Sequence, residues 1–180
     1  DDVMFLGGAR DRHMNKSMNS VLERYFTAVN ASLGRQKSRV LRAWGPVAEA
    51  ESEWPKLRAY DEHGFTLAAH GATFGGTKID AGTQFLLESL DVEGDEVLDF
   101  GCGNGSLSLW LAARGKRVAA VDVSWAAIAG TQIGAAASDL DVATRWADGT
   151  ASFPEHSFDA IVTNPPFHRG TAKDSDATLA

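Results

Sequence analysis

The second half of the chain alternates between short runs of apolar residues and longer amphipathic segments. In chain order, this pattern predicts strands at 96–100, 117–123, 142–147 and 158–163, and helices at 106–114 and 125–137. Strands that alternate with helices of this length form βαβ units, in which helices cover a parallel sheet. We therefore predict an α/β fold with a Rossmann-like parallel sheet and helices on both faces. Such sheets usually have about six strands, so we expect this one to be truncated after its fourth strand.

The first half of the chain follows a different pattern. Apolar residues between Met18 and Leu33 recur at spacings of three and four, which predicts one amphipathic helix. Further along, the pattern predicts one or two short strands over 65–74 and a helix over 80–90. The first of these segments is therefore expected to be the helical tail of an N-terminal domain.

A break in the pattern separates that tail from the rest. Trp44-Gly45-Pro46 and the acidic stretch that follows are typical of a domain junction. We therefore divide the chain into the end of an N-terminal domain, a linker and a second domain, at residues 1–45, 46–56 and 57–180.

Composition and charge narrow the class of protein. The chain is 44% hydrophobic and 23% charged, which is typical of a globular protein, and no apolar run approaches the roughly 20 residues of a membrane helix. The single cysteine, Cys102, cannot form an internal disulfide or a cysteine-rich zinc site. We expect a soluble, cytoplasmic protein without a metal site or a membrane partner, and a monomer.

The charge is unevenly distributed along the chain. Residues 1–44 carry eight Lys/Arg and four Asp/Glu, whereas the remainder carries nine and twenty, so that the total of −7 hides a basic head. The densest basic cluster is Arg35, Lys37, Arg39 and Arg42. Such an asymmetry favours a polyanionic partner such as RNA. A simpler alternative is that these cations stabilise the end of a helix.

A glycine-rich turn follows the first strand of the predicted parallel sheet. The stretch from Asp99 to Gly105 places Gly101, Gly103 and Gly105 between a strand and a helix. Glycines in this position let the backbone turn tightly and approach a nucleotide-type ligand. Asp122 ends the next strand, where a carboxylate can accept hydrogen bonds from ribose hydroxyls.

The identity of the cofactor depends on the residues around this turn. The spacing is G-x-G-x-G, and Ser106 stands where a dinucleotide-binding motif has Gly or Ala. Asp99 would repel a pyrophosphate but would attract a cationic sulfonium with an amino-acid tail. The turn therefore favours S-adenosylmethionine over NAD. Asp148, after the third strand, could accept from the adenine amine or could simply form a turn, and Cys102 is best explained as a small residue that fits the loop.

The fourth predicted strand ends in Asn164-Pro165-Pro166-Phe167. The two prolines fix the loop in an extended form. The Asn164 side-chain oxygen and the Pro165 carbonyl can then both accept hydrogen bonds from one NH2 group, and Phe167 offers a face for stacking a base. Two fixed acceptors orient a poorly nucleophilic amine toward a methyl group and stabilise its developing positive charge. This arrangement predicts methyl transfer to an amine.

Together these residues resemble class I, S-adenosylmethionine-dependent N-methyltransferases. The longer run from Asn164 through His168 to Gly170 resembles bacterial rRNA guanine-N2 methyltransferases that act on the small subunit, and their large-subunit sisters. The segment 75–83 is similar to the lead-in to that family's catalytic domain, whose residues help close the cofactor pocket. The stretch 33–39 is similar to the end of its N-terminal domain.

The resemblance implies a role for each of these residues. It implies that residues 1–45 belong to an RNA-binding or folding domain, that 57–180 is the catalytic domain, and that ribosomal RNA or a ribosomal subunit is the partner. Asp99 and the three glycines would hold the methionine part of the cofactor, Asp122 the ribose and Asp148 the adenine. Asn164 through Phe167 would hold the guanine. His168 either orders the loop or acts as a general base.

Two rival interpretations stay open from the sequence. One is the same chemistry on another amine, namely adenine N6 or the side chain of a protein glutamine, although those families usually carry Tyr or Trp at the position of Phe167. The other is a non-catalytic module that retains the fold and binds RNA. The intact glycine turn and the intact motif at Asn164 argue against such a module.

Overall fold

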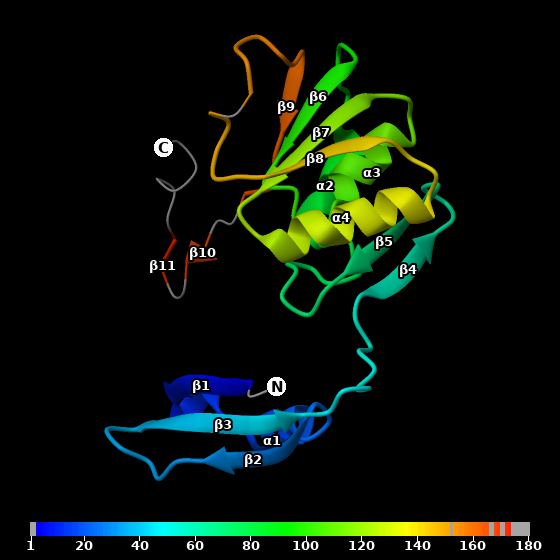
Figure 1. Ribbon diagram of the computed structural model, residues 1–180. Coiled ribbons are helices and arrows are strands. Elements are labelled where there is room, and N and C mark those ends of the chain that lie inside the picture. Colours follow the sequence, from blue (N-terminus) through cyan, green and yellow to red (C-terminus); the bar gives the residue numbers. More distant parts are fainter. Residues whose placement is uncertain (1–2, 152, 166–167, 170–171, 174–180) are drawn as a thin grey trace. The chain divides into compact units, whose positions relative to one another are not determined.

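A computed structural model of the chain describes residues 3–151, 153–165, 168–169 and 172–173 (Figure 1). For residues 168–169 and 172–173 it describes the backbone alone. The chain divides into two compact units, Asp1–Ser52 and Glu53–Ala180. Pro166 and Phe167, two of the predicted site residues, lie outside the described residues.

The N-terminal unit is built around an antiparallel sheet with the strand order β1-β3-β2. Its elements, in chain order, are β1 (Met4–Arg10), the 3-10 turn η1 (Asp11–His13), α1 (Lys16–Leu22), β2 (Phe26–Ala31) and β3 (Ser38–Pro46). The predicted helical tail is therefore wrong, because this unit is built on three strands and its one α-helix spans only seven of the described residues.

The helix predicted between Met18 and Leu33 is only partly present. Helix α1 ends at Leu22, and Phe26 and Val29 of the predicted helix belong to β2, where Val29 lies opposite Ala43 of β3. Aromatic and β-branched residues such as Phe26 and Val29 favour a strand when a partner strand is available. Since that partner lies more than ten residues further along the chain, local spacing alone gave the wrong element.

The basic cluster also lies in a different element from the one expected. Arg35 and Lys37 lie in the turn between β2 and β3, while Arg39 and Arg42 are in β3 itself. No helix end is present there in the described structure, so the helix-capping explanation of this cluster is wrong. Arg39 forms an ion pair with Asp11, with Nε and Oδ1 2.8 Å apart.

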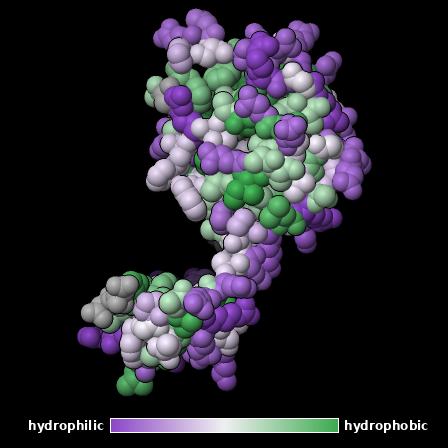
Figure 2. Space-filling view, turned by 45° about the vertical axis from the view of Figure 1, so that its right-hand side comes forward, coloured by the Kyte–Doolittle hydropathy of each residue, from purple (hydrophilic) through white to green (hydrophobic). Residues whose placement is uncertain are grey.

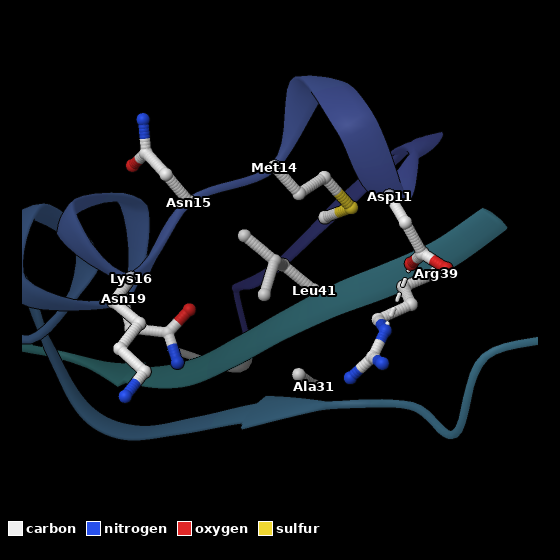
Figure 3. Close-up of a pocket in the computed structure, with 8 residues that line it drawn as sticks. All are labelled: Asp11, Met14, Asn15, Lys16, Asn19, Ala31, Arg39 and Leu41. Carbon is white, nitrogen blue, oxygen red and sulfur yellow. Dashed lines mark hydrogen bonds and ion pairs between the residues drawn. The ribbon is translucent and has the colours of Figure 1, made fainter. Parts of the chain in front are cut away.

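A hollow in this unit lies between β3 and the segment that leads into α1. Figure 3 shows Leu41 in its centre, with Met14 on one side and the ion pair of Asp11 and Arg39 at one end. Leu41 is buried, and with Ala43 it makes up the buried hydrophobic residues among the described residues of this unit. The unit therefore has a small core of its own.

The C-terminal unit contains the predicted parallel sheet, with the strand order β8-β7-β6-β9. Its strands are β6 (Glu96–Phe100), β7 (Arg117–Asp122), β8 (Val142–Trp146) and β9 (Ala160–Val162), and its helices are α2 (Ala81–Ser89), α3 (Ser106–Ala112) and α4 (Trp125–Ala137). All of these neighbouring strands pair in parallel. The α/β fold and every element predicted after residue 80 are confirmed.

The two faces of this sheet are covered differently. Val97 of β6 points into the main core, which also contains Leu87 of α2, Leu109 of α3 and Ala135 of α4. Leu98, on the opposite face, packs with residues of the segment that links β8 to β9. Within the described residues the three helices thus share one face, and the expected helices on both faces are found on one face only.

A hairpin of β4 (Lys56–Tyr60) and β5 (Phe65–Ala69) precedes the sheet and packs on α4. The sequence indicated β5 but gave no sign of β4. Helix α4 approaches β5 so closely at Gly130 that a Cβ there would lie 2.5 Å from the Ala68 carbonyl oxygen. Only a glycine fits at that contact. A further short pair, β10 (His168–Arg169) and β11 (Ala172–Lys173), is antiparallel.

The surface of the described chain is mixed in character. On the face shown in Figure 2, hydrophobic residues lie among hydrophilic ones rather than forming one continuous apolar area. None of the helices in the described residues has the length and hydrophobicity needed to cross a bilayer.

Candidate functional site

Several of the predicted site residues meet at the carboxyl end of the parallel sheet. Strands β6 and β9 are adjacent and parallel, with Asp99 opposite Val162. The glycine turn follows β6 and Asn164 follows β9, so both lie at the carboxyl ends of neighbouring strands. The strand order also reverses between β6 and β9, which is the point where open α/β sheets bind their ligands.

A small cavity lies at this end of the sheet. Its walls combine the glycine turn, the start of α2 and the residue after β9: Phe74, Asp80, Thr83, Asp99, Gly101, Cys102, Gly103, Asn104, Ser106, Leu107 and Asn164. The turn after β6 and the residue after β9, which are more than 60 positions apart in the sequence, therefore share one cavity. Gly105, Asp122 and Asp148 do not line it.

The three glycines of the turn serve two different purposes. Gly101 and Gly103 have φ values of 73° and 55°, and a Cβ on Gly101 would meet nothing within 4 Å. The space above Gly101 is therefore open to a ligand, and the nearest atom to a Cβ on Gly103 would be Phe74 Cδ1 at 4.0 Å. At Gly105, by contrast, φ is 78° and a Cβ would lie 2.6 Å from the Thr131 hydroxyl oxygen. Gly105 is therefore required for packing α3 against α4.

Asp99 is buried beneath the turn. Its Oδ2 accepts a hydrogen bond from the Ser108 hydroxyl at 2.5 Å, whereas its Oδ1 is buried and has no partner among the described residues. Burial raises the pKa of Asp99 to about 6, although the bond from Ser108 opposes this shift and the charge of Asp122 adds to it. A carboxylate oxygen buried without a donor is costly, so this atom fits a ligand that brings a cationic N–H group.

Asp122 braces the turn from the end of β7. Its Oδ2 accepts from the Gly103 N–H at 2.9 Å, and its Oδ1 accepts from the Ser124 N–H at 2.7 Å. The predicted contact of Asp122 with a ribose stays a prediction, as does the contact of Asp148 with adenine. Asp148 is exposed in the loop after β8.

Asn104 is a residue of the site that no motif in the sequence singled out. Its amide nitrogen donates to the carbonyls of Gly76 and Lys78, at 2.9 and 2.8 Å, and its oxygen accepts from the Ser106 hydroxyl at 2.6 Å. Asn104 thus fastens the segment before α2 to the glycine turn. The resemblance of the segment 75–83 to a pocket-closing lead-in was the available signal.

Cys102 has a structural role in this arrangement. The thiol is buried, and burial raises its pKa well above the usual range. Its sulfur lies 3.8 Å from the Thr131 hydroxyl. A thiol held neutral in this way is a poor nucleophile, in agreement with the expectation that Cys102 simply fits the loop.

Asn164 is held by the first turn of α2. Its amide nitrogen donates to Asp80 Oδ2 and to Thr83 Oγ1, both at 3.0 Å. The amide oxygen has no hydrogen-bond partner among the described residues, and Asn164 lines the cavity. The atom that the sequence analysis assigned to accepting an amine is therefore available. The side chain of His168 lies outside the described residues.

The described residues at this end of the sheet form no metal site built from His, Cys, Asp or Glu side chains. Within the described residues, no group of three or more His, Cys, Asp or Glu side chains is arranged to hold a metal ion. The donor set of the cavity instead combines one buried carboxylate, backbone groups of a glycine turn and an oriented amide. That combination suits an organic ligand with a cationic amine.

Comparison with known proteins places this site in a family. The model of the methyltransferase small domain matches residues 64–180. Ribosomal RNA small subunit methyltransferase C of Chromohalobacter salexigens is 41% identical over 129 residues, which are 69% of this chain and 38% of that protein. Ribosomal RNA large subunit methyltransferase G of Pseudomonas putida is 32% identical over 171 residues, which are 91% of this chain and 46% of that protein. The chain thus spans less than half the length of these relatives.

Solved structures agree on the fold. The T. thermophilus 16S rRNA N2 G1207 methyltransferase, solved with AdoMet and guanosine, superposes with a TM-score of 0.72 at 25% identity and covers 94% of this chain and 48% of its own. A Pyrococcus abyssi tRNA (uracil-54, C5)-methyltransferase, solved with S-adenosyl-L-homocysteine, gives a TM-score of 0.54 at 21% identity over 76% of this chain and 33% of its own. The second likeness concerns the fold alone.

Proposed function

Because this chain belongs to the methyltransferase small domain family, we propose that it is the catalytic part of an enzyme that methylates the N2 amine of a guanine in ribosomal RNA, with S-adenosylmethionine as the donor. The observation that carries the proposal is the orientation of Asn164. Its nitrogen is engaged by α2, and its oxygen is left at the cavity as an acceptor.

The cofactor would supply an activated methyl group carried on a positively charged sulfur. In this chain, the buried Asp99 Oδ1 would accept from the ammonium group of the cofactor, which relieves the cost of that unpaired oxygen. The open backbone at Gly101 and Gly103 leaves room for the methionine part. Asp122, which already holds the Gly103 N–H, would fix the shape of the turn while it contacts the ribose.

Asn164 would act on the acceptor base. Its Oδ1 and the Pro165 carbonyl would accept from the two N–H groups of the exocyclic amine and turn the nitrogen lone pair toward the methyl carbon. Both acceptors also stabilise the positive charge that develops on this nitrogen. The amine nitrogen held in this way would bond to the methyl carbon, and the electron pair of the broken carbon–sulfur bond would stay on sulfur. The proton leaves the amine for solvent afterwards, so no strong base is needed.

The partner and the location follow from the same assignment. We expect ribosomal RNA, naked or within a subunit, to be bound in the cytoplasm by a monomeric enzyme. The relatives are named for the small and for the large ribosomal subunit, so each subunit is a candidate substrate. The target guanine would have to leave its stack to reach the cavity.

The test combines cofactor binding with turnover. Calorimetric titration should detect S-adenosylmethionine but not NADH, and tritium from the methyl group should enter guanine in one ribosomal subunit. Asn164→Ala should retain cofactor affinity but lose roughly 10²–10³-fold in turnover, since it removes a fixed acceptor at the developing charge. Asp122→Ala should instead weaken cofactor binding, because it removes charge-assisted bonds of roughly 1.5–3 kcal/mol.

Each result also discriminates among the alternatives. Label in adenine N6 or in a protein glutamine would redirect the proposal to another amine. Binding of RNA and cofactor without any transfer would favour the non-catalytic module. Full turnover in Asn164→Ala would remove Asn164 from the mechanism.

A further inference from the structure

The start of α2 presents an unusual arrangement of acceptors toward Asn164. Asp80 is the N-cap of this helix, and its Oδ1 accepts from the Gly82 N–H at 2.9 Å. Its Oδ2 accepts from the Thr83 hydroxyl at 2.6 Å. The Asn164 amide nitrogen then lies within hydrogen-bond distance of both Asp80 oxygens and of the Thr83 oxygen. Two residues of one helical turn thus contact a residue more than 80 positions away.

We propose that Asp80 and Thr83 are positioning residues that set which end of the Asn164 amide faces the acceptor base. This inference rests on the proposed function, because it assigns a reason for the orientation of the group that would bind the amine. Neither residue is taken to touch the reacting atoms in this role.

The polarity of the hydrogen bonds is what selects the orientation. An ionised carboxylate offers acceptors only, and a threonine hydroxyl has a single hydrogen, which Thr83 donates to Asp80. Every group that α2 presents to the amide is therefore an acceptor. The Asn164 nitrogen brings two N–H donors to these acceptors, whereas a flipped amide would bring its oxygen to about 3 Å from three other oxygens.

The charge on Asp80 is consistent with this role. Burial alone would raise its pKa, but the hydrogen bonds from Thr83, Gly82 and Asn164 together lower it below the usual range. Asp80 is therefore ionised at neutral pH and cannot donate to Asn164. The amide is therefore held in one orientation at neutral pH.

The shape of the helix start allows the close approach. Gly82 has no side chain, and a Cβ there would lie 2.9 Å from Asn164 Oδ1 and 3.2 Å from its Nδ2. Thr83 is buried, so its hydroxyl is largely shielded from solvent. The pair is therefore fixed by packing as well as by hydrogen bonding.

The experiment uses variants that change polarity and keep shape. Asp80→Asn retains a good N-cap but replaces one acceptor by a donor, and Thr83→Val removes the hydroxyl at equal volume. We expect each to lower kcat about tenfold to hundredfold, with cofactor affinity within threefold of the parent, because a misplaced group near the reacting atoms costs rates of that size. Thr83→Ser should restore most of the turnover that Thr83→Val loses.

Gln84→Ala provides the matched control on the same helix. Among the described residues, the side-chain amide of Gln84 is hydrogen-bonded only to Glu88, on the exposed side of α2, so its loss should leave kcat unchanged. Equal kcat in the parent, Asp80→Asn and Thr83→Val would overturn the proposal. A parallel loss of thermal stability and cofactor affinity in these variants would also overturn it, since that would indicate a purely structural role.

A second measurement does not depend on activity. The side-chain amide resonances of Asn164, assigned by comparison with Asn164→Asp, should shift in Asp80→Asn and Thr83→Val and stay in place in Gln84→Ala. If the parent protein transferred no methyl group, the proposed function would fail, and the shifts would still report whether α2 orients the amide. Unmoved resonances would contradict the positioning role even in an active enzyme.

Discussion

The two units of this chain bury their apolar residues to different extents. In the N-terminal unit, Leu41 and Ala43 are the buried hydrophobic residues among those described, while Met4 and Leu6 of β1 are 59% and 62% exposed. In the C-terminal unit, the buried set includes most of β5 and most of α3. The first unit is organised by pairing between strands, and the second by a packed core.

This difference explains where the candidate site lies. Every residue that lines the cavity belongs to the C-terminal unit, where the core holds the ends of β6 and β9 in register. An oriented amide and an unpaired carboxylate oxygen need neighbours that cannot move away. A unit with two buried hydrophobic residues offers no such support among its described residues.

The largest effect is expected where the core is most complete. Leu109 of α3 is fully buried, so Leu109→Ala should lower the free energy of unfolding by about 2–5 kcal/mol. Leu33 in the N-terminal unit is 94% exposed, and Leu33→Ala should change it by less than about 0.5 kcal/mol. Denaturant unfolding followed by circular dichroism measures both. Similar losses in the two variants would contradict the contrast between the units.

The next effect concerns the buried charge of the site. The pKa of Asp99 is raised from 3.8 to about 6, first by burial, so the folded state binds its proton more tightly than the unfolded state does. Its contribution to stability is therefore present below pH 3.8 and is lost as the pH rises through 6, by about 3 kcal/mol in all.

The variant Asp99→Asn removes this titration. Relative to the parent, it should gain stability between pH 4 and pH 7.5 by up to about 3 kcal/mol, and it should lose cofactor affinity at every pH. Paired denaturant curves at the two pH values measure the gain. A stability difference that does not change with pH would indicate that Asp99 is not buried as described.

A smaller effect tests the close contact between α4 and β5. Alanine is favoured over glycine in a helix, but a Cβ at Gly130 would lie 2.5 Å from a backbone oxygen. We expect the clash to dominate, so that Gly130→Ala lowers the free energy of unfolding by about 1–3 kcal/mol. In Gly8→Ala, the new Cβ would come no closer than 3.9 Å to its neighbours. Its thermal unfolding should match that of the parent, and a stabilised Gly130→Ala would refute the described packing.

The unequal burial of apolar residues in the two units also determined how much of the fold could be predicted. In the C-terminal unit, apolar runs such as 96–100 and 117–122 became β6 and β7 because buried parallel strands are marked by local sequence. Strand β4 escaped prediction because its residues, apart from Tyr60, are exposed. In the N-terminal unit, β2 was mistaken for helix because its partner β3 is distant in sequence.

The candidate site was predictable in part for a similar reason. Asp99, the glycine turn and Asn164 follow strand ends, and the topology brings such positions together. The contact of Asp80 with Asn164 could not be foreseen, because it depends on how α2 packs across the sheet end. The division of roles between Gly101 and Gly105 likewise depends on Thr131, which local sequence does not place.

The smallest effect concerns the basic residues of the N-terminal unit. Arg39 is neutralised by Asp11, and both side chains are about half exposed, so Arg39→Ala should change stability by less than about 1 kcal/mol. Arg42 is exposed and has no ion-pair partner among the described residues. If this unit contacts RNA, Arg42→Ala should lower the affinity for ribosomal RNA and reduce its salt dependence by about one phosphate contact. Arg39→Ala should change both less, because the Asp11 carboxylate already offsets its charge. Salt-dependent filter binding measures the two slopes, and a larger change for Arg39→Ala would show that the ion pair opens when RNA binds.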